Sequence, residues 1–344
     1  MAKKRIAILT GGGDCCGLNQ TIRGAVYRAK DFDYETFGIK DGWKGLIEGM
    51  VSPITLTDVE ELVDKAGTIL GSSRTNPYRI ENGVERVLKT IKNYGLDAII
   101  ATGGEDTLGV AYQLFKEEKV NVVGAPKTMD NDLSGTDYTF GFDSSVTRAV
   151  EAMKILEDTG RSHHRVMILE VMGRHAGWVA LFTGIACGAD WTLIPEYDTD
   201  IDAMCQQIQR VFARKKYALI VASEGVNLPG QREEEEELDE FGHMILKNRG
   251  IGNRLNDIIC AKTGLETRYS VIGHMQRGGN PTVFDRLLGL RSGVTAVNLI
   301  KKNKYGYMAA LKGNEVVGVP LEVAVSKLKV VDEKWWDLAK IFFK

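Results

Sequence analysis

Residues 5–14 read RIAILTGGGD, a short apolar run that ends in three glycines and an aspartate. The run is typical of a buried strand, and an amphipathic helical pattern over 18–30 follows the glycines. A glycine turn between a strand and a helix brings backbone N–H groups to a helix N-terminus, where they can bind an anion. Taken alone, the motif is equally compatible with an ordinary tight turn.

The same order of strand, glycine turn and helix recurs along the chain. Further buried strands are expected at 97–102, 120–124, 166–171, 217–223 and 269–274. Helical patterns are expected at 106–116, 144–156, 175–186, 202–215 and 251–262. This alternation predicts an α/β fold with parallel sheets, in which ligands bind beyond the carboxyl ends of the strands.

Composition narrows the class of protein. A chain of 344 residues predicts two domains, and its net charge of -2 argues against a nucleic-acid partner. The sequence lacks an apolar stretch of about 18 residues, so a membrane partner is not expected. Five cysteines do not form a disulfide framework, which favours a cytoplasmic location. The acidic run at 233–237 is interpreted as a solvated insertion.

Two loops after predicted strands carry paired carboxylates. Glu105 and Asp106 follow Gly103-Gly104, and a phosphate bound there would need a bridging cation, which indicates a Mg²⁺ site. The same two carboxylates also suit an ordinary helix start. In the loop PKTMDND at 126–132, Asp130 can act as a base on a substrate hydroxyl while Asp132 orients a neighbour or faces the metal. An Asx-type turn is the structural alternative.

Arginines at strand ends and in glycine-flanked loops point to phosphate groups, which the guanidinium fork binds in a bidentate manner. Individually, each arginine is also compatible with a solvated surface position. The candidates are Arg74, Arg165, Arg174, Arg268 and Arg277.

Together these loops form a series of motifs in a fixed order. They are LTGGGDC at 9–15, GLN at 17–19, GSSR at 71–74, GGEDT at 103–107, PKTMDND at 126–132, EVMGR at 170–174, SEG at 223–225 and GHMQRGG at 273–279. The series resembles the phosphofructokinase family over nearly the whole chain. Cys16 stands where the family commonly has Pro, and Met129 where it commonly has Ile, but neither change removes a reacting group.

The resemblance implies two Rossmann-like α/β domains with the active site in the cleft between them. Residues 1–141 and 253–304 would form the phosphoryl-donor-binding domain, and 142–252 with 305–344 the fructose 6-phosphate-binding domain. It also implies a homodimer or homotetramer, in which Arg165 and Arg268 reach the site of a neighbouring subunit.

The resemblance further assigns roles to single residues. Gly12 and Arg74 would bind the phosphoryl donor, Glu105 would hold Mg²⁺, and Asp130 would accept the proton of the sugar 1-hydroxyl. Sugar-phosphate-binding positions would be Thr128, Met129, Asp130, Arg165, Met172, Gly173, Arg174, Glu224, Arg268, His274, Met275, Gln276 and Arg277.

Two residues indicate which phosphoryl donor is used. ATP-dependent members usually carry Gly at the position of Asp106, whose carboxylate would repel the α-phosphate of a nucleotide. Lys127 supplies a positive charge to the phosphoryl groups, and the pair resembles the pyrophosphate-dependent branch. The implied reaction is reversible transfer from pyrophosphate to fructose 6-phosphate in glycolysis or gluconeogenesis, giving fructose 1,6-bisphosphate. Alternatives are an ATP-dependent 6-phosphofructokinase, a non-catalytic sugar-phosphate-binding regulatory subunit, or a kinase of another substrate.

Overall fold

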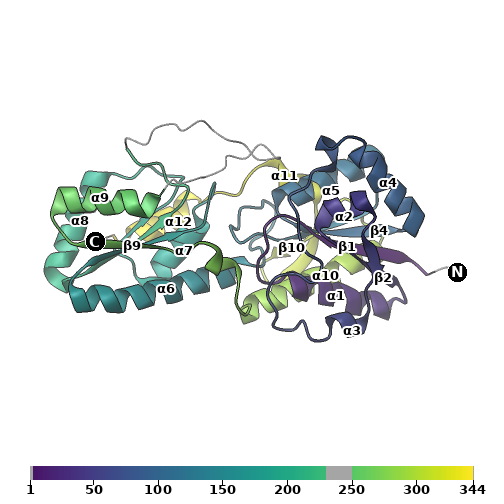
Figure 1. Ribbon diagram of the computed structural model, residues 1–344, viewed down its shortest axis with the longest axis horizontal. Coiled ribbons are helices and arrows are strands. Elements are labelled where there is room, and N and C mark those ends of the chain that lie inside the picture. Colours follow the sequence, from purple (N-terminus) through teal and green to yellow (C-terminus); the bar gives the residue numbers. More distant parts are fainter. Residues whose placement is uncertain (1–2, 230–249, 344) are drawn as a thin grey trace.

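The computed structural model describes residues 3–229 and 250–343, which form two lobes, each built on a mainly parallel sheet (Figure 1). The acidic run at 233–237 lies outside the described residues. The order of the larger sheet is β11 (Glu315–Pro320), β10 (Tyr307–Lys312), β5 (Val122–Pro126), β4 (Ala98–Gly103), β1 (Arg5–Thr10), β2 (Glu35–Ile39) and β3 (Val51–Pro53). The order of the smaller sheet is β7 (Trp191–Leu193), β8 (Ala218–Ser223), β6 (Val166–Val171) and β9 (Thr267–Val271).

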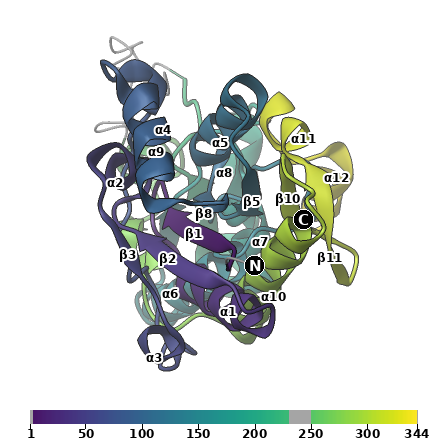
Figure 2. The same ribbon diagram turned by 90° about the vertical axis from the view of Figure 1, so that its right-hand side faces the viewer.

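Helices cover both faces of each sheet. On one face of the larger sheet lie α2 (Gly42–Glu48), α4 (Gly83–Tyr94), α5 (Glu105–Glu118) and α11 (Leu321–Ser326), and on the other lie α1 (Leu18–Asp31), α3 (Leu56–Val59) and α10 (Val283–Lys301) (Figure 2). The smaller sheet packs against α6 (Phe142–His163), α7 (Trp178–Cys187) and α12 (Glu333–Lys340) on one face, and α8 (Ile201–Lys215) and α9 (Ile251–Thr263) on the other. Short 3₁₀ helices span Pro77–Arg79 and Gly273–Arg277.

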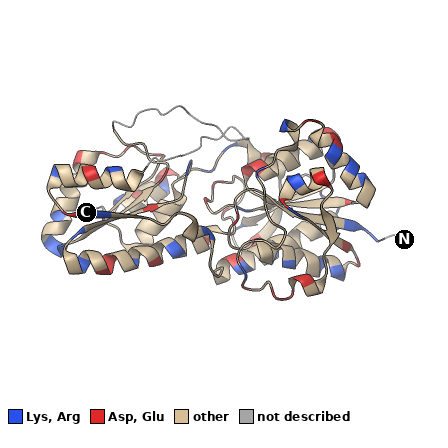
Figure 3. Cartoon of the chain, viewed as in Figure 1, with Lys and Arg blue, Asp and Glu red and all other residues tan. Residues whose placement is uncertain are grey.

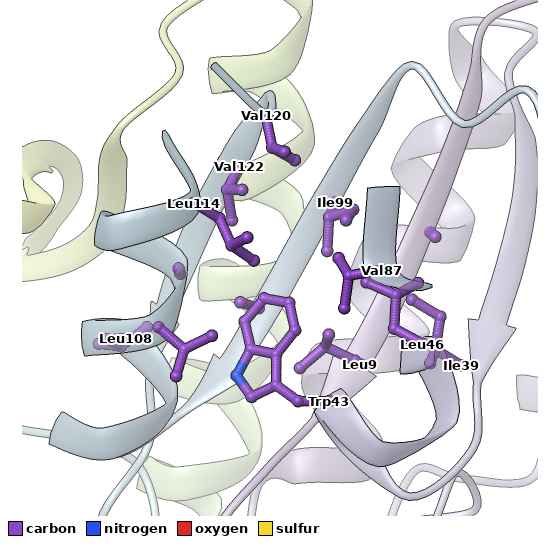
Figure 4. Close-up of a cluster of buried hydrophobic side chains, with 14 of the residues drawn as sticks. Leu9, Ile39, Trp43, Leu46, Val87, Ile99, Leu108, Leu114, Val120 and Val122 are labelled. Atoms are coloured by element: carbon purple, nitrogen blue, oxygen red, sulfur yellow. The ribbon is translucent and has the colours of Figure 1, made fainter. Parts of the chain in front are cut away.

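Strand β1 explains why the opening run is apolar at every position. Ile6 and Ile8 pack toward α1 and α10, whereas Leu9 packs toward α2 and α5 on the opposite face. All three side chains are fully buried, because successive side chains of a strand point to opposite faces and both faces are covered. In Figure 4, Leu9 lies beside Trp43 of α2 in the core between that helix and the sheet.

The strand order creates a crevice for ligands. The chain leaves β1 for β2 on one side of the sheet and leaves β4 for β5 on the other side. β1 and β4 are hydrogen-bonded neighbours, so the loops after their carboxyl ends diverge at this point. In open α/β sheets, ligands bind in the crevice at such a switch point.

The predicted α/β fold with parallel sheets is confirmed. Strands β1 and β6 have the expected bounds, and β9 begins two residues earlier than expected, at Thr267. The sheets divide the chain differently from the expected segments at two places. β9, within 253–304, pairs with β6 in the smaller sheet, whereas β10, within 305–344, pairs with β5 in the larger sheet. Parallel pairing between distant strands decides both placements.

Acidic and basic residues are interspersed along the helices of both lobes (Figure 3). Among the residues that the structure describes, no helix has the length and apolar character to cross a membrane.

Candidate active site

A cleft of about 400 Å³ lies where the carboxyl-end loops of the two sheets meet. Its volume falls in the range typical of small-molecule sites. The larger lobe contributes loops after β1, β4 and β5, and the smaller lobe contributes loops after β6, β8 and β9. The lining residues that the sequence predicted are Gly12, Arg74, Glu105, Asp106, Lys127, Thr128, Met129, Asp130, Met172, Arg174, Glu224, His274 and Arg277.

The glycine loop after β1 passes between side chains from both lobes. A Cβ atom on Gly11 would lie 2.5 Å from Oγ1 of Thr107, and one on Gly13 would lie 2.7 Å from Nη1 of Arg277. Gly12 has a φ of +78°, in the left-handed region that favours glycine. The loop therefore needs glycine for its close approaches and its backbone geometry, and it brings its backbone to the floor of the cleft.

Helix α5 begins at the cleft with two carboxylates in its first turn. Its N-cap is Gly104, so Glu105 and Asp106 lie inside the helix, where the helix dipole favours negative charge. Both side chains line the cleft. Trp43 of α2 donates an indole N–H to the carbonyl of Thr107 at 3.3 Å, which links this helix start to the apolar core.

Lys127 lies at the end of β5 with only 4% of its surface exposed. Its ammonium donates a hydrogen bond to the carbonyl of Gly13 at 2.5 Å. Burial lowers the pKa of Lys127 below its usual value. The arrangement holds a cationic group directly against the glycine loop, and Lys127 and Asp106 both line the cleft.

The loop that carries Asp130 is fixed by its own hydrogen bonds. The backbone N–H of Asp130 donates to Oγ1 of Thr128 at 3.1 Å, and Thr139 donates its hydroxyl to the carbonyl of Thr128 at 2.7 Å. Asn131 has a φ of +52°, and its side-chain oxygen accepts from the N–H of Thr139 at 3.2 Å. The turn that these bonds close keeps Asp130 and Asp132 at the cleft wall.

The electrostatic environment of Asp130 resists ionisation. Burial and the neighbouring Asp132 raise the pKa of Asp130 to about 6, against the opposing effect of Arg277 and Arg174. Burial also raises the pKa of Asp132. Oδ1 of Asp130 is buried, and it has no hydrogen-bond partner among the described residues. A carboxylate in such a place is a strong acceptor for a hydroxyl proton.

The smaller lobe forms the opposite wall. Gly173 has a φ of +145°, and its N–H donates to Oε1 of Glu224 at 3.4 Å. Burial, followed by the charge of Asp130, raises the pKa of Glu224. Arg277 joins the two lobes, because its guanidinium donates to the carbonyl of Asp14 at 3.0 Å.

Some predicted residues lie outside the cleft lining. Met275 is 69% exposed, and Gly173 is not among the lining residues although its neighbours Met172 and Arg174 are. Gln276 is buried, and its side chain accepts from the N–H of Met172 at 2.8 Å and donates to Ser145 at 3.1 Å. Gln276 thus anchors the loop that carries Met172.

Arg165 and Arg268 also lie outside the cleft of their own chain. Both guanidinium groups contact Glu266, at 2.8 and 2.6 Å. Their expected contribution to a neighbouring subunit's site stays a prediction.

The cleft also contains residues that the sequence motifs did not single out as ligands. His175 directly follows Arg174, and Asp14 lies two residues after Gly12 in the glycine loop, so their position was a usable signal. Leu328 comes from the C-terminal region, and its residue type carries no sign of a site.

The chain is similar to known phosphofructokinases in both sequence and fold. The family model described as phosphofructokinase matches residues 5–300. A pyrophosphate–fructose 6-phosphate 1-phosphotransferase of Dictyoglomus thermophilum is 47% identical over 347 residues, covering 100% of this chain and 99% of the relative. An ATP-dependent 6-phosphofructokinase of Corynebacterium efficiens is 43% identical over 349 residues and is covered completely. The solved pyrophosphate-dependent phosphofructokinase of Marinobacter aquaeolei shares the fold, with a TM-score of 0.83 at 20% identity over 99% of this chain and 91% of that one.

Proposed function

The chain belongs to the phosphofructokinase family, and we propose that it transfers a phosphoryl group from pyrophosphate to the 1-hydroxyl of fructose 6-phosphate. The products are fructose 1,6-bisphosphate and phosphate. One P–O bond of pyrophosphate breaks while another forms to the sugar oxygen. Because pyrophosphate and a phosphate ester differ little in the free energy of phosphoryl transfer, the reaction runs in both directions.

The observation that carries this proposal is the charge pattern at the donor end of the cleft. Asp106 lines the cleft in the first turn of α5, and Lys127 also lines it, with its ammonium on the glycine loop. A pyrophosphate needs cationic and N–H groups around two phosphorus centres. The α-phosphate and nucleoside of ATP need further space, which a carboxylate at position 106 would fill with a charge of the same sign. The pattern therefore favours the smaller donor.

Asp130 is the proposed base. Because its pKa is about 6, most of it is ionised at neutral pH, while the basicity exceeds that of an ordinary aspartate. It accepts the proton of the 1-hydroxyl as that oxygen attacks one phosphorus of pyrophosphate and the other leaves as phosphate. Lys127 then stabilises the negative charge on the transferred group and the leaving phosphate.

The sugar phosphate fits the opposite wall. Arg174, His274 and Arg277 line the cleft there and supply donors for the 6-phosphate and ring hydroxyls. Glu224 accepts hydrogen bonds from sugar hydroxyls. These contacts fix the 1-hydroxyl toward Asp130, so much of the rate enhancement comes from positioning.

The carboxylates at the donor end fit a magnesium ion. Mg²⁺ keeps several waters and binds through one or two carboxylates together with substrate phosphates, so a preformed cage of protein ligands is not required. Within residues 3–229 and 250–343, no group of three His, Cys, Asp or Glu side chains is arranged to hold a metal ion. Glu105 is the proposed protein ligand, and when bound the ion neutralises charge on the donor phosphates. We expect chelation by EDTA to abolish activity and added Mg²⁺ to restore it.

A coupled assay of fructose 1,6-bisphosphate formation tests the donor directly, with pyrophosphate and ATP compared in the presence of Mg²⁺. We expect strong activity with pyrophosphate and little with ATP. Asp106→Gly, alone and with Lys127→Gly, should lose pyrophosphate activity and gain ATP binding. Glu118→Gly, at the exposed far end of the same helix, is the matched control and should behave as the parent. A preference of the parent for ATP would refute the donor proposal.

An ATP-dependent 6-phosphofructokinase is the second candidate, because a relative with that name is 43% identical over the full chain. A non-catalytic regulatory subunit is disfavoured, because Glu105 and Asp130 both lie in the cleft.

We also propose that two subunits complete each site, with Arg165 and Arg268 contributed by the neighbour. Mixing the inactive variants Asp130→Ser and Arg165→Ala should restore partial activity, since a hybrid dimer then holds one intact site. Absence of any recovery after refolding the mixture would contradict the shared site.

A further inference from the structure

The chain crosses between the lobes a last time after α11, along an extended segment at 328–332 that leads to α12. This segment, here called the C-terminal strap, lies outside all the motifs that resemble the family. Leu328 at its start lines the active-site cleft. The strap therefore touches the proposed active site from a part of the sequence that carries no recognisable site residue.

The strap is fastened to the loop that carries Asp130. Leu328 forms an antiparallel bridge with Leu133, and the backbone N–H of Lys329 donates to the carbonyl of Asp132 at 2.7 Å. The Lys329 ammonium donates to the carbonyls of Thr136 at 3.2 Å and Asp137 at 2.5 Å. Lys329 thus contacts the loop at Asp132 through its backbone and at Thr136 and Asp137 through its side chain.

The same strap is fastened to the smaller lobe. Trp178 of α7 donates its indole N–H to the carbonyl of Lys329 at 2.8 Å. Glu196 accepts from the N–H groups of Val331 and Gly177, both at 2.9 Å, and Gly177 ends the loop that brings His175 into the cleft. The strap consequently joins a wall of the sugar-phosphate site to the loop of the proposed base.

The Lys329 ammonium lies between two aromatic rings, 5.3 Å from the centroid of Trp178 and 5.7 Å from that of Tyr138. Aromatic faces and carbonyl oxygens are geometrically selective partners for a cation, so they fix its position. A partly buried ammonium also costs solvation free energy, as its lowered pKa reflects. An apolar side chain of similar length would fill the same space without that cost.

We propose that Lys329 is a positioning residue for the phosphoryl transfer, which holds the Asp130 loop in register with the sugar-phosphate wall. This inference rests on the proposed function. The ammonium clamps the turn at Thr136 and Asp137 while the backbone of Lys329 bonds Asp132 and Trp178. Loss of the clamp would let the base shift relative to the sugar hydroxyl, and small misplacements of reacting groups cost large factors in rate.

The test compares Lys329→Met, Lys329→Arg and the control Lys327→Met. Methionine keeps the apolar stem and removes the ammonium, arginine retains a cation that can reach both carbonyls, and Lys327 is exposed just before the strap. For Lys329→Met we expect kcat to fall about tenfold with the KM for fructose 6-phosphate within about twofold of the parent. Lys329→Arg should recover most of the activity, and Lys327→Met should match the parent.

Amide hydrogen exchange supplies a readout that does not depend on turnover. In Lys329→Met, peptides covering 128–139 should exchange faster, while the melting temperature of the protein stays near that of the parent. Unchanged kcat together with unchanged exchange would overturn the proposal, as would a global loss of stability shared by Lys329→Met and Lys329→Arg. If the parent protein fails to phosphorylate fructose 6-phosphate, the proposed function falls, and the exchange comparison still decides whether Lys329 holds the loop.

Discussion

Replacing Asp130 by Asn is expected to stabilise the protein while it removes the proposed base. Burial and Asp132 raise the pKa of Asp130 from 3.8 to about 6, so the native state binds this proton more tightly than the unfolded chain does. Below about pH 4 both states hold the proton, and the group costs no stability. As the pH rises from 4 to 6 the unfolded state releases its proton first, so the native state loses stability, and the cost is complete above pH 6.

The difference between 3.8 and about 6 corresponds to about 3 kcal/mol in the free energy of unfolding. The residue is half-buried, so solvent screening reduces the expected gain in the variant to about 1–2 kcal/mol at pH 7. The loss of kcat should be at least about 100-fold, the usual contribution of a general base. Asp130 would thus raise kcat and at the same time lower the free energy of unfolding.

The assay is urea unfolding of the parent and of Asp130→Asn between pH 4.5 and 8, without substrates. The stability gain of the variant should shrink as the pH falls toward 4, because the parent then carries a proton on Asp130. Glu117→Gln, which removes an exposed carboxylate from α5, should show no such pH-dependent gain. The reasoning is refuted if Asp130→Asn is less stable than the parent at pH 7, or if the difference does not vary with pH.

The remaining tests vary the pH and change three residues: Asp132, Gly225 beside Arg174, and Gly109 in α5. The kcat/KM of the parent should rise about tenfold between pH 5 and pH 7, because the ionised form of Asp130 increases across its pKa. Asp132→Asn should move this rise to lower pH, because it removes a charge that repels ionised Asp130. The pH–rate profiles of both proteins check this. Gly225→Ala should raise the KM for fructose 6-phosphate about tenfold and lower the free energy of unfolding by about 1–3 kcal/mol, since its Cβ would lie 2.1 Å from the carbonyl oxygen of Arg174. Initial-rate kinetics and urea unfolding measure the two effects. Values equal to those of the parent would contradict this close packing. Gly109→Ala in α5, where a Cβ meets no atom within 4 Å, should instead stabilise by about 0.5–1 kcal/mol with unchanged kinetics.

The local sequence was sufficient to predict strand β1 and the loops that follow the parallel strands. The run at 5–10 predicts β1 because both faces of that strand are buried, and apolar side chains at every position are the direct result. The rule that ligands bind at the carboxyl ends of parallel strands predicted that Gly12, Asp130 and Arg277 would share one cleft, although they lie far apart in sequence.

Long-range pairing could not be predicted in the same way. The resemblance assigned the segments that contain β9 and β10 to the opposite lobes, and nothing within either strand indicates which distant strand it pairs with. Strand β7 has three residues, too few to show a pattern. Gln276 was interpreted as a ligand from its motif, whereas packing turns its amide inward to Met172. Leu328 reaches the cleft because the strap crosses between lobes, a fact of topology.

The position of β10 has a consequence for how the protein is made. A ribosome releases β5 long before β10, and all strands of the smaller sheet are synthesised between them. Until Tyr307 and Met308 emerge, Val123 and Gly124 lie on an unpaired edge of the nascent larger sheet. Open edges of this kind invite pairing with other chains, so protection by a chaperone matters most in this interval. A chain that ends before Tyr307 would leave the edge of β5 unpaired, and we expect such a chain to aggregate or to be degraded.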